Sequence, residues 1–579
     1  MSEQTHRRPD ERAWRDLVLV AVFAAGLALR LVGLAHGLPH VYNPDEVSIL
    51  SRALGLGSGD LNPHNFLYPS LFFYVLAAAT GILAGIQWAL GQVSSLGAFE
   101  ARFWQDPTTV YLAARLLVAV AGALTVPATY ALAQRVGGQR VARVAAAFMA
   151  VAYVPVRDAH VIKHDVPATL LILVAVLASW RVWKRGRVLD YLLAGLSVGV
   201  AASFHYYGVY ALVPLVAAHA LRTGFAPGAW LSPRVFLAAA AMLLAFAAGS
   251  PYVVLDYTTA MRDIQANRLI IVDRAQHVYG PFGSAVPQLG YLLSQATLWI
   301  PAAVVGAIAL GRASVPLLVW TVSFPLVFFL FISNTWPFGR TANPLYPFLA
   351  ILGAYGIAAL ARRTGRHAPV VLAILAAAAV IQPLALSVSA VYLLRQTDTR
   401  TLAREWIHAH VPAGASVAVE PYSVQLRPTR ERLVEALANA GLRPEQAGRR
   451  SAMLLARTPY PSPSYRLFYI GERGMDEDKI YLPPEWFTRE EPGSREPEAC
   501  VEWVVLKSAA PSGPSPLAPF VVRSGTLVHR ETPFVEAGLP ADGWLPDTDV
   551  TPSLRVTRPG PVIEVWRTPG LCGAAGAGR

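Results

Sequence analysis

The chain has 579 residues, of which 54% are hydrophobic and 15% are charged. An ordinary soluble protein is about 25% charged, and the deficit lies before residue 395, where long apolar runs recur. The net charge of +12 does not indicate nucleic-acid binding, because many of the lysines and arginines stand in short clusters between apolar runs. These features predict a polytopic membrane protein with a water-soluble tail.

The N-terminal stretch 1–16 is basic and leads into an apolar run from Leu17 to Leu34. That run is too long for a secretory signal, so we expect a retained first span that starts in the cytoplasm. With ten further apolar runs, about eleven transmembrane helices are predicted over 17–394. The ten runs are Thr109–Gln134, Val141–Val156, Val166–Val182, Tyr191–Ser203, Tyr207–Leu221, Val235–Val254, Leu289–Leu310, Ser314–Ile332, Pro344–Ala361 and Pro369–Leu394.

One more apolar run, Leu67–Leu90, is predicted not to cross. Basic clusters should face the cytoplasm. If this run were counted as a span, most of the basic clusters would lie on the outer side of the membrane. We therefore expect a juxtamembrane helix in the outer leaflet. The outer face then receives the four loops around 43–46, 157–165, 255–288 and 333–343. The basic clusters lie at 135–143, 181–187, 222–234, 312 and 362–366.

Three acidic residues are expected at this outer face. Asp45 and Glu46 follow Asn43-Pro44 directly after the first span, and Asp165 precedes Val166-Pro167. Two carboxylates from separate loops can divide labour, one taking a proton from a hydroxyl while the other orients it or binds a cation. The alternative is helix capping, because Asp is favoured at helix starts and Pro in the first turn.

Cationic and aromatic residues complete the candidates at this face. Arg340 stands beside Trp336 in a short outer loop, where an arginine suits a phosphate group. Lys163 and the arginines of 255–288 are weaker candidates. His160 and His164 fit interfacial polar residues better than metal ligands. Arg30, near the outer end of the first span, is expected to pair with Asp45 or Glu46, because a charge there is costly. Aromatic residues near the outer ends suit an interfacial belt or sugar stacking.

The tail, 395–579, is predicted to be a small α/β domain. Thr401–His410 has the pattern of an amphipathic helix. One segment alternates like a strand, three more are strand candidates, and Pro511–Pro519 is a loop. The tail has no phosphate loop, zinc-type spacing or nucleophile elbow. Its cysteines, Cys500 and Cys572, could pair in an oxidising compartment. The four strand candidates are Ser416–Glu420, Leu467–Ile470, Val501–Lys507 and Val562–Arg567.

Several motifs in this order resemble a known family over residues 15–395. They are Ala28–Leu31, Asn43–Glu46, the stretch from His64 through Tyr68-Pro69, Ala114–Leu116 with Gly122–Pro127, His164–Pro167, and Asn343–Pro347 after Arg340. The chain resembles the family 39 glycosyltransferases, which are related to protein O-mannosyltransferases and to the lipid A aminoarabinose transferase. The resemblance implies a GT-C fold: an all-α polytopic membrane protein, here with a C-terminal soluble α/β domain.

The resemblance also implies an inverting transferase that uses a polyprenyl-phosphate sugar at the outer face of a bacterial plasma membrane. Asp45 would be the general base, Glu46 would assist it, and Asp165 would be the second acid. Arg340 would contact the phosphate, and the extended set of substrate-binding residues is His64, Tyr68, Lys163 and His164. No cofactor is certain; a divalent metal, if bound, would lie at Asp45 and Asp165.

Two departures from the family leave the acceptor open. The loop 255–288 is too short for the inserted sugar-binding domain of eukaryotic members, and the lysine that the aminoarabinose enzyme carries after its Asp-Glu pair is missing. The acceptor hydroxyl could belong to a protein, a lipid or a glycan. The alternative function is a multi-span transporter or flippase, which would favour charges near mid-bilayer and internal repeats; a scaffold with an inert bundle would leave the outer acids unexplained.

Overall fold

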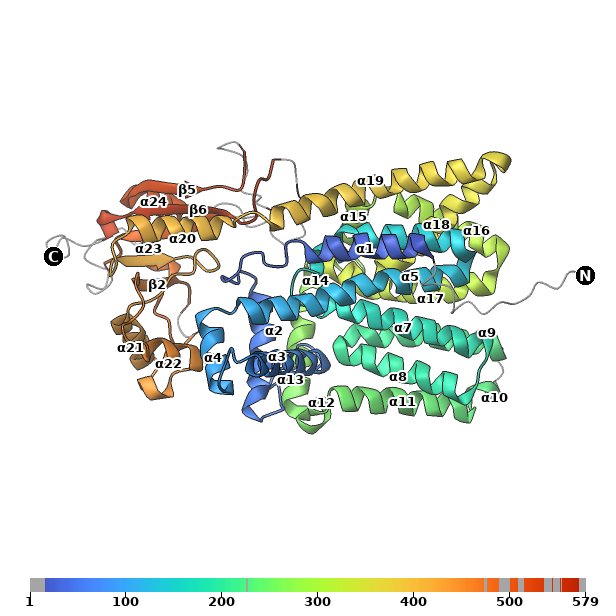
Figure 1. Cartoon of the computed structure of the whole chain (residues 1–579), viewed down its shortest axis with the longest axis horizontal. Helices are drawn as coiled ribbons and strands as arrows, with labels where there is room; N and C mark the ends of the chain where they lie inside the picture. Colours follow the sequence, from blue (N-terminus) through green and yellow to red (C-terminus); the bar gives the residue numbers. More distant parts are fainter. Residues whose placement is uncertain are drawn as a thin grey trace, which may run out of the picture. The chain divides into compact units, whose positions relative to one another are not determined.

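The computed structural model describes residues 16–224, 227–472, 476–488, 500–508, 515–535, 544, 552 and 555–571. The chain divides into two compact units (Figure 1). The helical unit comprises Met1–Leu34, Asn43–Ile86 and Val110–Val391, and the sheet unit comprises Ala35–Tyr42, Gln87–Thr109 and Tyr392–Arg579. The N-terminal arginines and Cys572 lie outside the described residues.

The helical unit is a bundle of long helices with shorter helices at its ends (Figure 1). The bundle helices are α1 (Leu17–Leu31), α5 (Thr108–Val151), α7 (Asp165–Lys184), α8 (Val188–Phe204), α9 (Leu212–Thr223), α11 (Pro233–Gly249), α16 (Trp299–Ala313), α17 (Val315–Ile332), α18 (Tyr346–Arg362) and α19 (Ala368–Leu394). The other helical elements are α2 (Pro44–Gly55), η3 (Leu56–Ser58), α3 (Leu71–Ala89), α6 (Tyr153–Asp158), η4 (Tyr206–Ala211), α10 (Pro227–Trp230), α12 (Tyr252–Leu255), α13 (Tyr257–Arg268), η5 (Leu269–Asp273), α14 (Arg274–Tyr279), α15 (Ala285–Gln295), η6 (Gly339–Leu345) and η7 (Gly365–His367).

Helix α5 is a hairpin of two helices rather than one 44-residue rod. Gly138 breaks it with φ 75° and ψ −173°, a conformation that glycine adopts at little cost. Arg30 shows that the two halves run back along each other: its Nη1 donates to Ala150 O at 3.0 Å, and its Nε lies 3.2 Å from where a Cβ on Gly122 would be. The hairpin confirms the two separate apolar runs expected on either side of the 135–143 turn.

The basic connections gather at the end of the bundle where α1 begins. Arg143 Nε pairs with Asp16, the N-cap of α1, at 2.9 Å. A Cβ on Gly137 would lie 2.9 Å from Tyr355 near the end of α18, and one on Gly186 would meet Arg222. In Figure 1 this end carries the start of α1 and the helix α10, while α12 and α14 lie at the opposite end. The loops predicted to be outer therefore share one end of the bundle.

The chain is a multi-pass membrane protein by its helix lengths and apolar character. Within the described ranges, six helices are long and apolar enough to cross a membrane, or seven if the bent pair α15 and α16 is one span. Helices α1, α8 and α11 are apolar but shorter. The number of eleven spans remains a prediction from the sequence.

The run Leu289–Leu310, expected to be one span, is broken, because α15 and α16 are bent by 103° relative to each other. The break is stabilised from α19: Gln382 Nε2 donates to Ser294 O at 2.9 Å, and Gln382 Oε1 accepts from Thr297 N at 2.9 Å. An interrupted helix leaves backbone groups that must find partners, and Gln382 provides them on both sides of the break.

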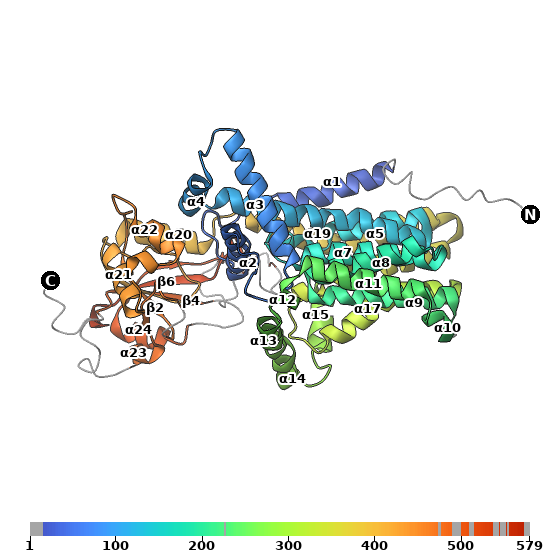
Figure 2. The same ribbon diagram turned by 90° about the horizontal axis from the view of Figure 1, so that it is seen from below.

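Helix α3 lies across the bundle. Figure 1 looks along its axis while α5, α7 and α11 run across the picture, and Figure 2 shows it steeply inclined to them. It starts at the outer-loop end, where Ser70 N donates to Ser250 Oγ after α11. By length and composition alone α3 counts among the six candidate spans, with exposed Ile82 and Ile86. Its place in the outer leaflet remains a prediction.

The outer segment 255–288, expected to be a loop, is largely helical. It folds as α12, α13, a π-helical turn η5, and α14. The stretch 257–279 contains neither glycine nor proline, so no residue in it is a strong helix breaker. A sequence reading based on apolar run length missed these helices because they are too polar to span a membrane.

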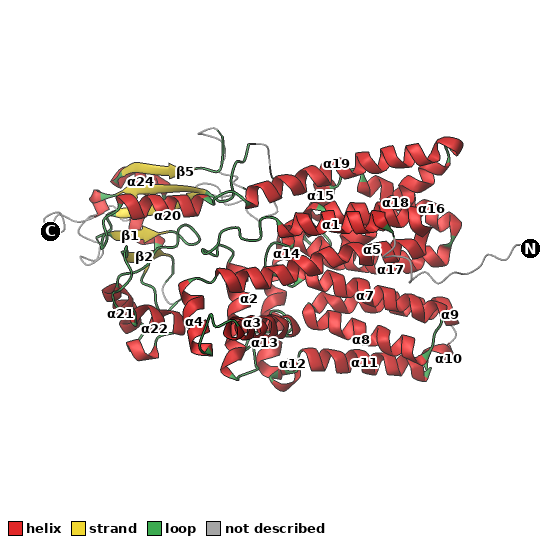
Figure 3. Ribbon diagram, in the orientation of Figure 1, coloured by secondary structure: helices red, strands yellow, loops and turns green. Residues whose placement is uncertain are grey.

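The sheet unit is an α/β domain, and Figure 3 shows its strands in yellow. The strands are β1 (Ser416–Val419), β2 (Arg466–Ile470), β3 (Tyr481–Leu482), β4 (Trp503–Ser508), β5 (Thr526–Glu531) and β6 (Val562–Arg567). They form one sheet in the order β3-β2-β1-β4-β6-β5. The pairs among β1 to β4 are parallel, and β6 is antiparallel to β4 and β5. The helices are α4 (Leu96–Gln105), α20 (Thr399–His410), α21 (Arg430–Asn439), η8 (Pro444–Gln446), α22 (Arg449–Leu455), α23 (Pro484–Thr488), α24 (Ala518–Ser524) and η10 (Pro569–Leu571).

Both faces of this sheet are buried. Ile407 of α20 packs on the face of Val417 and Val505, whereas Val521 of α24 packs on the face of Ala418 and Val504. The four strands and the helix predicted from the sequence are confirmed within a few residues; β3 and β5 were missed. Cys500 is disulfide-bonded, and most of the predicted loop Pro511–Pro519 lies outside the described residues.

Candidate active site

Asp45 is placed by the start of α2 but does not cap it. Asn43 is the cap: its Oδ1 accepts a hydrogen bond from Asp45 N at 2.9 Å, and Pro44 occupies the first turn. This leaves the Asp45 carboxylate available, and Lys163 Nζ lies 2.8 Å from its Oδ2. The Asp45 side chain remains 43% exposed, whereas that of Lys163 is 7% exposed.

The electrostatic surroundings keep Asp45 ionised. Burial raises the pKa of Asp45, but the charges of Lys163 and Arg340 outweigh it, so the pKa lies below its usual value. A nearby cation favours the charged form of a carboxyl group. Asp45 is therefore an accessible carboxylate that is deprotonated at neutral pH.

Glu46, the neighbour of Asp45, is held in a buried ion pair. Arg115 of α5 donates from Nε and Nη2 to its two carboxylate oxygens at 2.8 and 2.7 Å, and Ile162 N donates to Oε1 at 2.9 Å. Glu46 is 0% exposed. Both oxygens accept charge-assisted hydrogen bonds and the side chain is fully buried, so Glu46 can orient α2 and the 157–165 loop but is not accessible to a substrate.

Arg340 and Asp165 join Asp45 in one cluster. Arg340 of η6 interacts electrostatically with Asp45, Asp165 and Tyr68. Asp165 is the first residue of α7, and the N-cap position is occupied by His164; the Asp165 Oδ1 accepts from the Tyr207 hydroxyl at 3.2 Å. The structure thus brings together the second acid and the arginine that the sequence predicted, with Tyr207 added from η4.

A second buried acid, Asp158, ties the loop of Arg340 to the bundle. Arg157 Nε donates to Asp158 Oδ1 at 2.7 Å, and Asn343 Nδ2 donates to Asp158 Oδ2 at 2.6 Å. Asn343 also donates to Arg340 O at 2.9 Å. Asn343 therefore joins the backbone of Arg340 to a fixed carboxylate, which limits the positions that Arg340 can take.

Tyr68 and His164 form an aromatic wall beside these charges. Their rings stack with centroids 4.2 Å apart and planes 8° apart, and Tyr68 also interacts with Arg340. Burial raises the pKa of the Tyr68 phenol to about 12. Burial also lowers the pKa of His164 far below its usual value, so His164 is neutral and Lys163 and Arg340 supply the positive charge.

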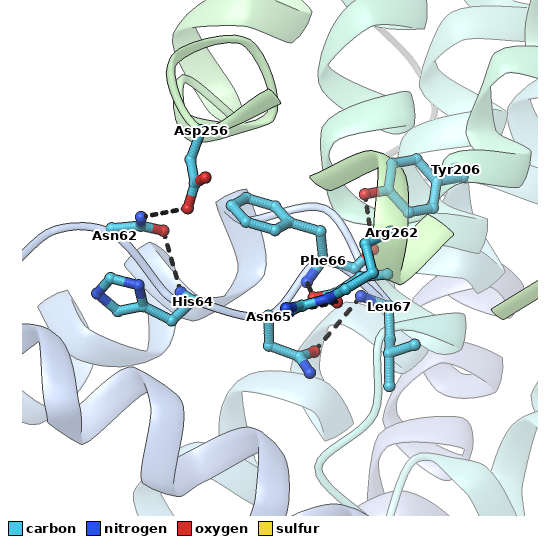
Figure 4. A network of polar contacts seen from close by, with 9 residues as sticks. Asn62, His64, Asn65, Phe66, Leu67, Tyr206, Asp256 and Arg262 are labelled. Atoms are coloured by element: carbon cyan, nitrogen blue, oxygen red, sulfur yellow. Dashed lines mark hydrogen bonds and ion pairs between the residues drawn. The ribbon is translucent and has the colours of Figure 1, made fainter. Parts of the chain in front are cut away.

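The loop leading to Tyr68 is fixed by polar contacts with α13 and its surroundings (Figure 4). Phe66 N donates to Asp263 Oδ2 at 2.9 Å, and the Tyr206 hydroxyl donates to Phe66 O at 2.9 Å. His64 lies in the same loop but away from the cluster: its side chain is 64% exposed, with Nε2 2.7 Å from Asp60. The expected grouping of His64 with the other substrate-binding residues is thus absent from this arrangement.

Arg30 does not pair with an acid as the sequence led us to expect. Its guanidinium donates to Gly26 O, Ala150 O and Met149 O at 2.8 to 3.1 Å. These last two carbonyls lie at the end of α5, where helical hydrogen bonding stops, so they need donors. Arg115 takes the place beside Glu46 instead.

The arrangement does not fit a metal ion between Asp45 and Asp165. Lys163 already neutralises Asp45, and Asp165 accepts from Tyr207. Within the described part of the chain, no group of three or more His, Cys, Asp or Glu side chains is placed to hold a metal ion.

The sequence assigned no role in the site to Arg115, Asp158, Asn343 or Tyr207, although Arg115 and Asn343 stand in the family motifs and Tyr207 near a predicted outer end. Arg115 stands in a run expected to span a membrane, and a charge there does signal a buried partner. Asp158 lies in the loop 157–165, and nothing in the sequence singles it out from the other polar residues of that loop. Nothing local in the sequence indicates that Tyr207 would reach Asp165, 42 residues away.

Residues 109–253 match the family model described as dolichyl-phosphate-mannose-protein mannosyltransferase. A search of curated protein sequences finds no match. Among solved structures, ArnT from Cupriavidus metallidurans bound to undecaprenyl phosphate is 14% identical, with 96% of this chain and 98% of that chain covered and a TM-score of 0.49. The oligosaccharyltransferase AglB from Archaeoglobus fulgidus, in complex with an inhibitory peptide and a dolichol-phosphate, is 13% identical, with 85% and 69% covered and a TM-score of 0.47.

The family match covers α5 to the start of α12, which includes Asp158, Asp165 and Tyr207. It confirms, over that stretch, the resemblance to the protein mannosyltransferases. The chain is a multi-pass membrane protein that is similar to the protein mannosyltransferases over residues 109–253.

Proposed function

We propose that the protein is an inverting glycosyltransferase that moves a sugar from a polyprenyl-phosphate carrier to a hydroxyl acceptor. The observation that carries this proposal is the ion-paired but half-exposed carboxylate of Asp45, next to Lys163 and Arg340. A carboxylate that is ionised and accessible can accept a proton, and two cations beside it suit a phosphate leaving group.

In the proposed reaction, Asp45 is the general base. Its carboxylate accepts the proton of the acceptor hydroxyl while that oxygen attacks the anomeric carbon of the sugar. The bond from the anomeric carbon to the phosphate oxygen breaks, and its electron pair leaves with the lipid phosphate. Because attack and departure occur on opposite faces of the carbon, the configuration inverts.

Arg340 and Lys163 are proposed to stabilise the phosphate as its negative charge grows. Charge aimed at a leaving group contributes most when it is fixed in advance, and the hydrogen bond from Asn343 to Arg340 O contributes to such fixation. Asp165 would hold the acceptor or a sugar hydroxyl, with Tyr68 and His164 as an apolar wall. Glu46 would act only by positioning α2.

The proposed location of the site is the outer face of a bacterial plasma membrane. The basic connections lie at the opposite end of the bundle from Asp45, and basic loops stay in the cytoplasm. The disulfide at Cys500 supports an extracytoplasmic sheet unit, because disulfides persist in oxidising compartments.

The test is sugar transfer by the purified full chain in lipid nanodiscs, with a panel of radiolabelled polyprenyl-phosphate sugars. Asp45→Asn should lower the rate about 100- to 10,000-fold, the usual range for losing a general base. Thermal unfolding should change little, because Asp45 is half exposed.

Asp60→Asn is the matched control, since Asp60 is an exposed acid whose partner is His64. It should transfer sugar at the wild-type rate. Full activity in Asp45→Asn would move the base role to Asp165. Absence of transfer from every donor by a well-folded protein would contradict the proposed function.

A further inference from the structure

Arg52 is a cation of α2 that the proposed reaction does not use. Arg52 follows Asp45 by seven residues. On a helix this is a rotation about 20° short of two full turns and a rise of roughly 10 Å along the axis, so both side chains lie on the same face. Arg52 Nη1 donates to Ser48 O at 2.8 Å and also to Ser48 Oγ. Both of these contacts lie within α2, one turn back.

The charge of Arg52 has no carboxylate partner. The ion pairs among the described residues do not include Arg52, although the side chain is half buried. Burial lowers the pKa of Arg52, and the more distant Asp263 only partly opposes this. A half-buried guanidinium that is not paired is costly, and a bound anion would offset that cost.

The surroundings of Arg52 belong to the site already described. Lys163 contacts Asp45, and the next residue, His164, lies close enough to Arg52 to be influenced by its charge. The face of α2 that carries both residues therefore lies along the 163–164 segment. Since His164 is neutral, Arg52 is the cation at the far end of this face.

We infer that Arg52 forms a second anion-binding site, which holds a phosphate or carboxylate group of the acceptor or of the donor two helical turns from Asp45. This inference rests on the proposed function, because it takes Asp45 as the place where the acceptor hydroxyl reacts. The donor phosphate nearest the sugar is already assigned to Arg340 and Lys163. An arginine fork suits planar or tetrahedral oxyanions, and the substrate class it selects is anionic.

The experiment measures binding rather than transfer, so that it does not depend on chemistry. The full chain carries Asp45→Asn in nanodiscs, alone and combined with Arg52→Gln, Arg52→Lys or Arg262→Gln. Arg262 is the matched control, an exposed arginine of α13 that is paired with Asp263. The probes are dodecyl glucoside against dodecyl glucoside 6-phosphate for the acceptor, and undecaprenyl phosphate against undecaprenyl diphosphate for the donor.

In either the acceptor pair or the donor pair of probes, the probe with the extra phosphate should bind at least tenfold more tightly than its partner probe. This is the difference expected for a hydrogen bond to a charged group. Arg52→Gln should abolish that preference, Arg52→Lys should keep part of it, and Arg262→Gln should keep all of it. The acceptor pair or the donor pair that responds identifies the source of the anion. Equal binding within both pairs, or a preference that survives Arg52→Gln, would overturn the inference.

A failure of the proposed function would look different from a failure of this site. If the wild-type protein transferred sugar from none of the donors, Asp45 would have no role as a base. The preference for the probe with the extra phosphate would be unchanged. Thermal unfolding of each variant verifies that it is folded, and Arg52→Lys keeps the test decisive if Arg52→Gln does not fold.

Discussion

The two ends of the helical bundle treat a carboxylate in opposite ways. At the end where α1 begins, Asp16 is 4% exposed and accepts hydrogen bonds from Tyr130, Gln139 and Arg143. At the other end, Asp45 is 43% exposed and has one close cation, Lys163. The first acid joins α1 to both halves of the α5 hairpin. The second is held beside a cation while one side stays open, as a reactive group requires.

The same contrast, between a buried carboxylate and an accessible one, exists between the adjacent residues Glu46 and Asp45. Glu46 is held by Arg115 and by Ile162 N, whereas Asp45 faces the cluster of Arg340 and Asp165. Two adjacent acids on one helix point to different sides, so one stabilises the fold and the other is available for chemistry. The predictions below test this division.

The largest effect on stability is expected for Glu46→Ala. It leaves the Arg115 guanidinium, 1% exposed, without its carboxylate, and breaking a buried pair from one side costs about 3–5 kcal/mol. Thermal unfolding in nanodiscs measures the change. Asp45→Asn is the control and should lower stability far less, because Asp45 is 43% exposed and the asparagine keeps an oxygen that can accept from Lys163. Equal losses in the two variants would contradict the division between the neighbours.

A smaller loss is expected for Asp16→Asn at the opposite end. Weakening hydrogen bonds to a charged group costs about 1.5–3 kcal/mol, so thermal unfolding should shift down. Sugar transfer measured below the new unfolding temperature should match the wild type, because Asp16 lies at the end without the cluster. A rate lowered as far as that of Asp45→Asn would show that the two ends are not independent.

The smallest effect is expected for Lys163→Met, which should shift the pH dependence of kcat/KM. Burial raises the pKa of Asp45, and Lys163 is the main group that lowers it. The base works as the carboxylate, so the rate falls as the pH drops through its pKa. Without Lys163 the pKa rises, and the acid limb of kcat/KM, which reports the free enzyme, should move to higher pH. Lys163→Arg should leave the limb in place; an unmoved limb in Lys163→Met would exclude Lys163 as the controlling charge.

The sequence predicted what depends on local pattern. Apolar run length gave the bundle helices, and period-2 alternation gave β1. Short strand-like segments gave β2, β4 and β6, and the basic clusters placed the acidic loops at one end. Asp45, Asp165, Arg340, Lys163, Tyr68 and His164 were all identified before the structure and lie in one cluster.

What the sequence could not give are contacts between distant residues. The Glu46–Arg115 pair spans 69 positions, and the Gln382 side chain that stabilises the break between α15 and α16 lies 85 positions beyond Thr297. Arg30 was expected to pair with a nearby acid and instead donates to carbonyls about 120 residues away. Several side chains compete for each buried charge, and only the packed bundle decides among them.

The contacts of Arg30 constrain the order in which the bundle can be assembled. A chain is synthesised from its N-terminus at about 5–20 residues per second, so α1 leaves the ribosome before Met149 and Ala150 exist. The guanidinium of Arg30 is costly in a bilayer when it has no partners. It must therefore be solvated in another way until the second half of the α5 hairpin has been made. Helix α1 can therefore reach its final packing only after α5, which is made later, has turned back at Gly138.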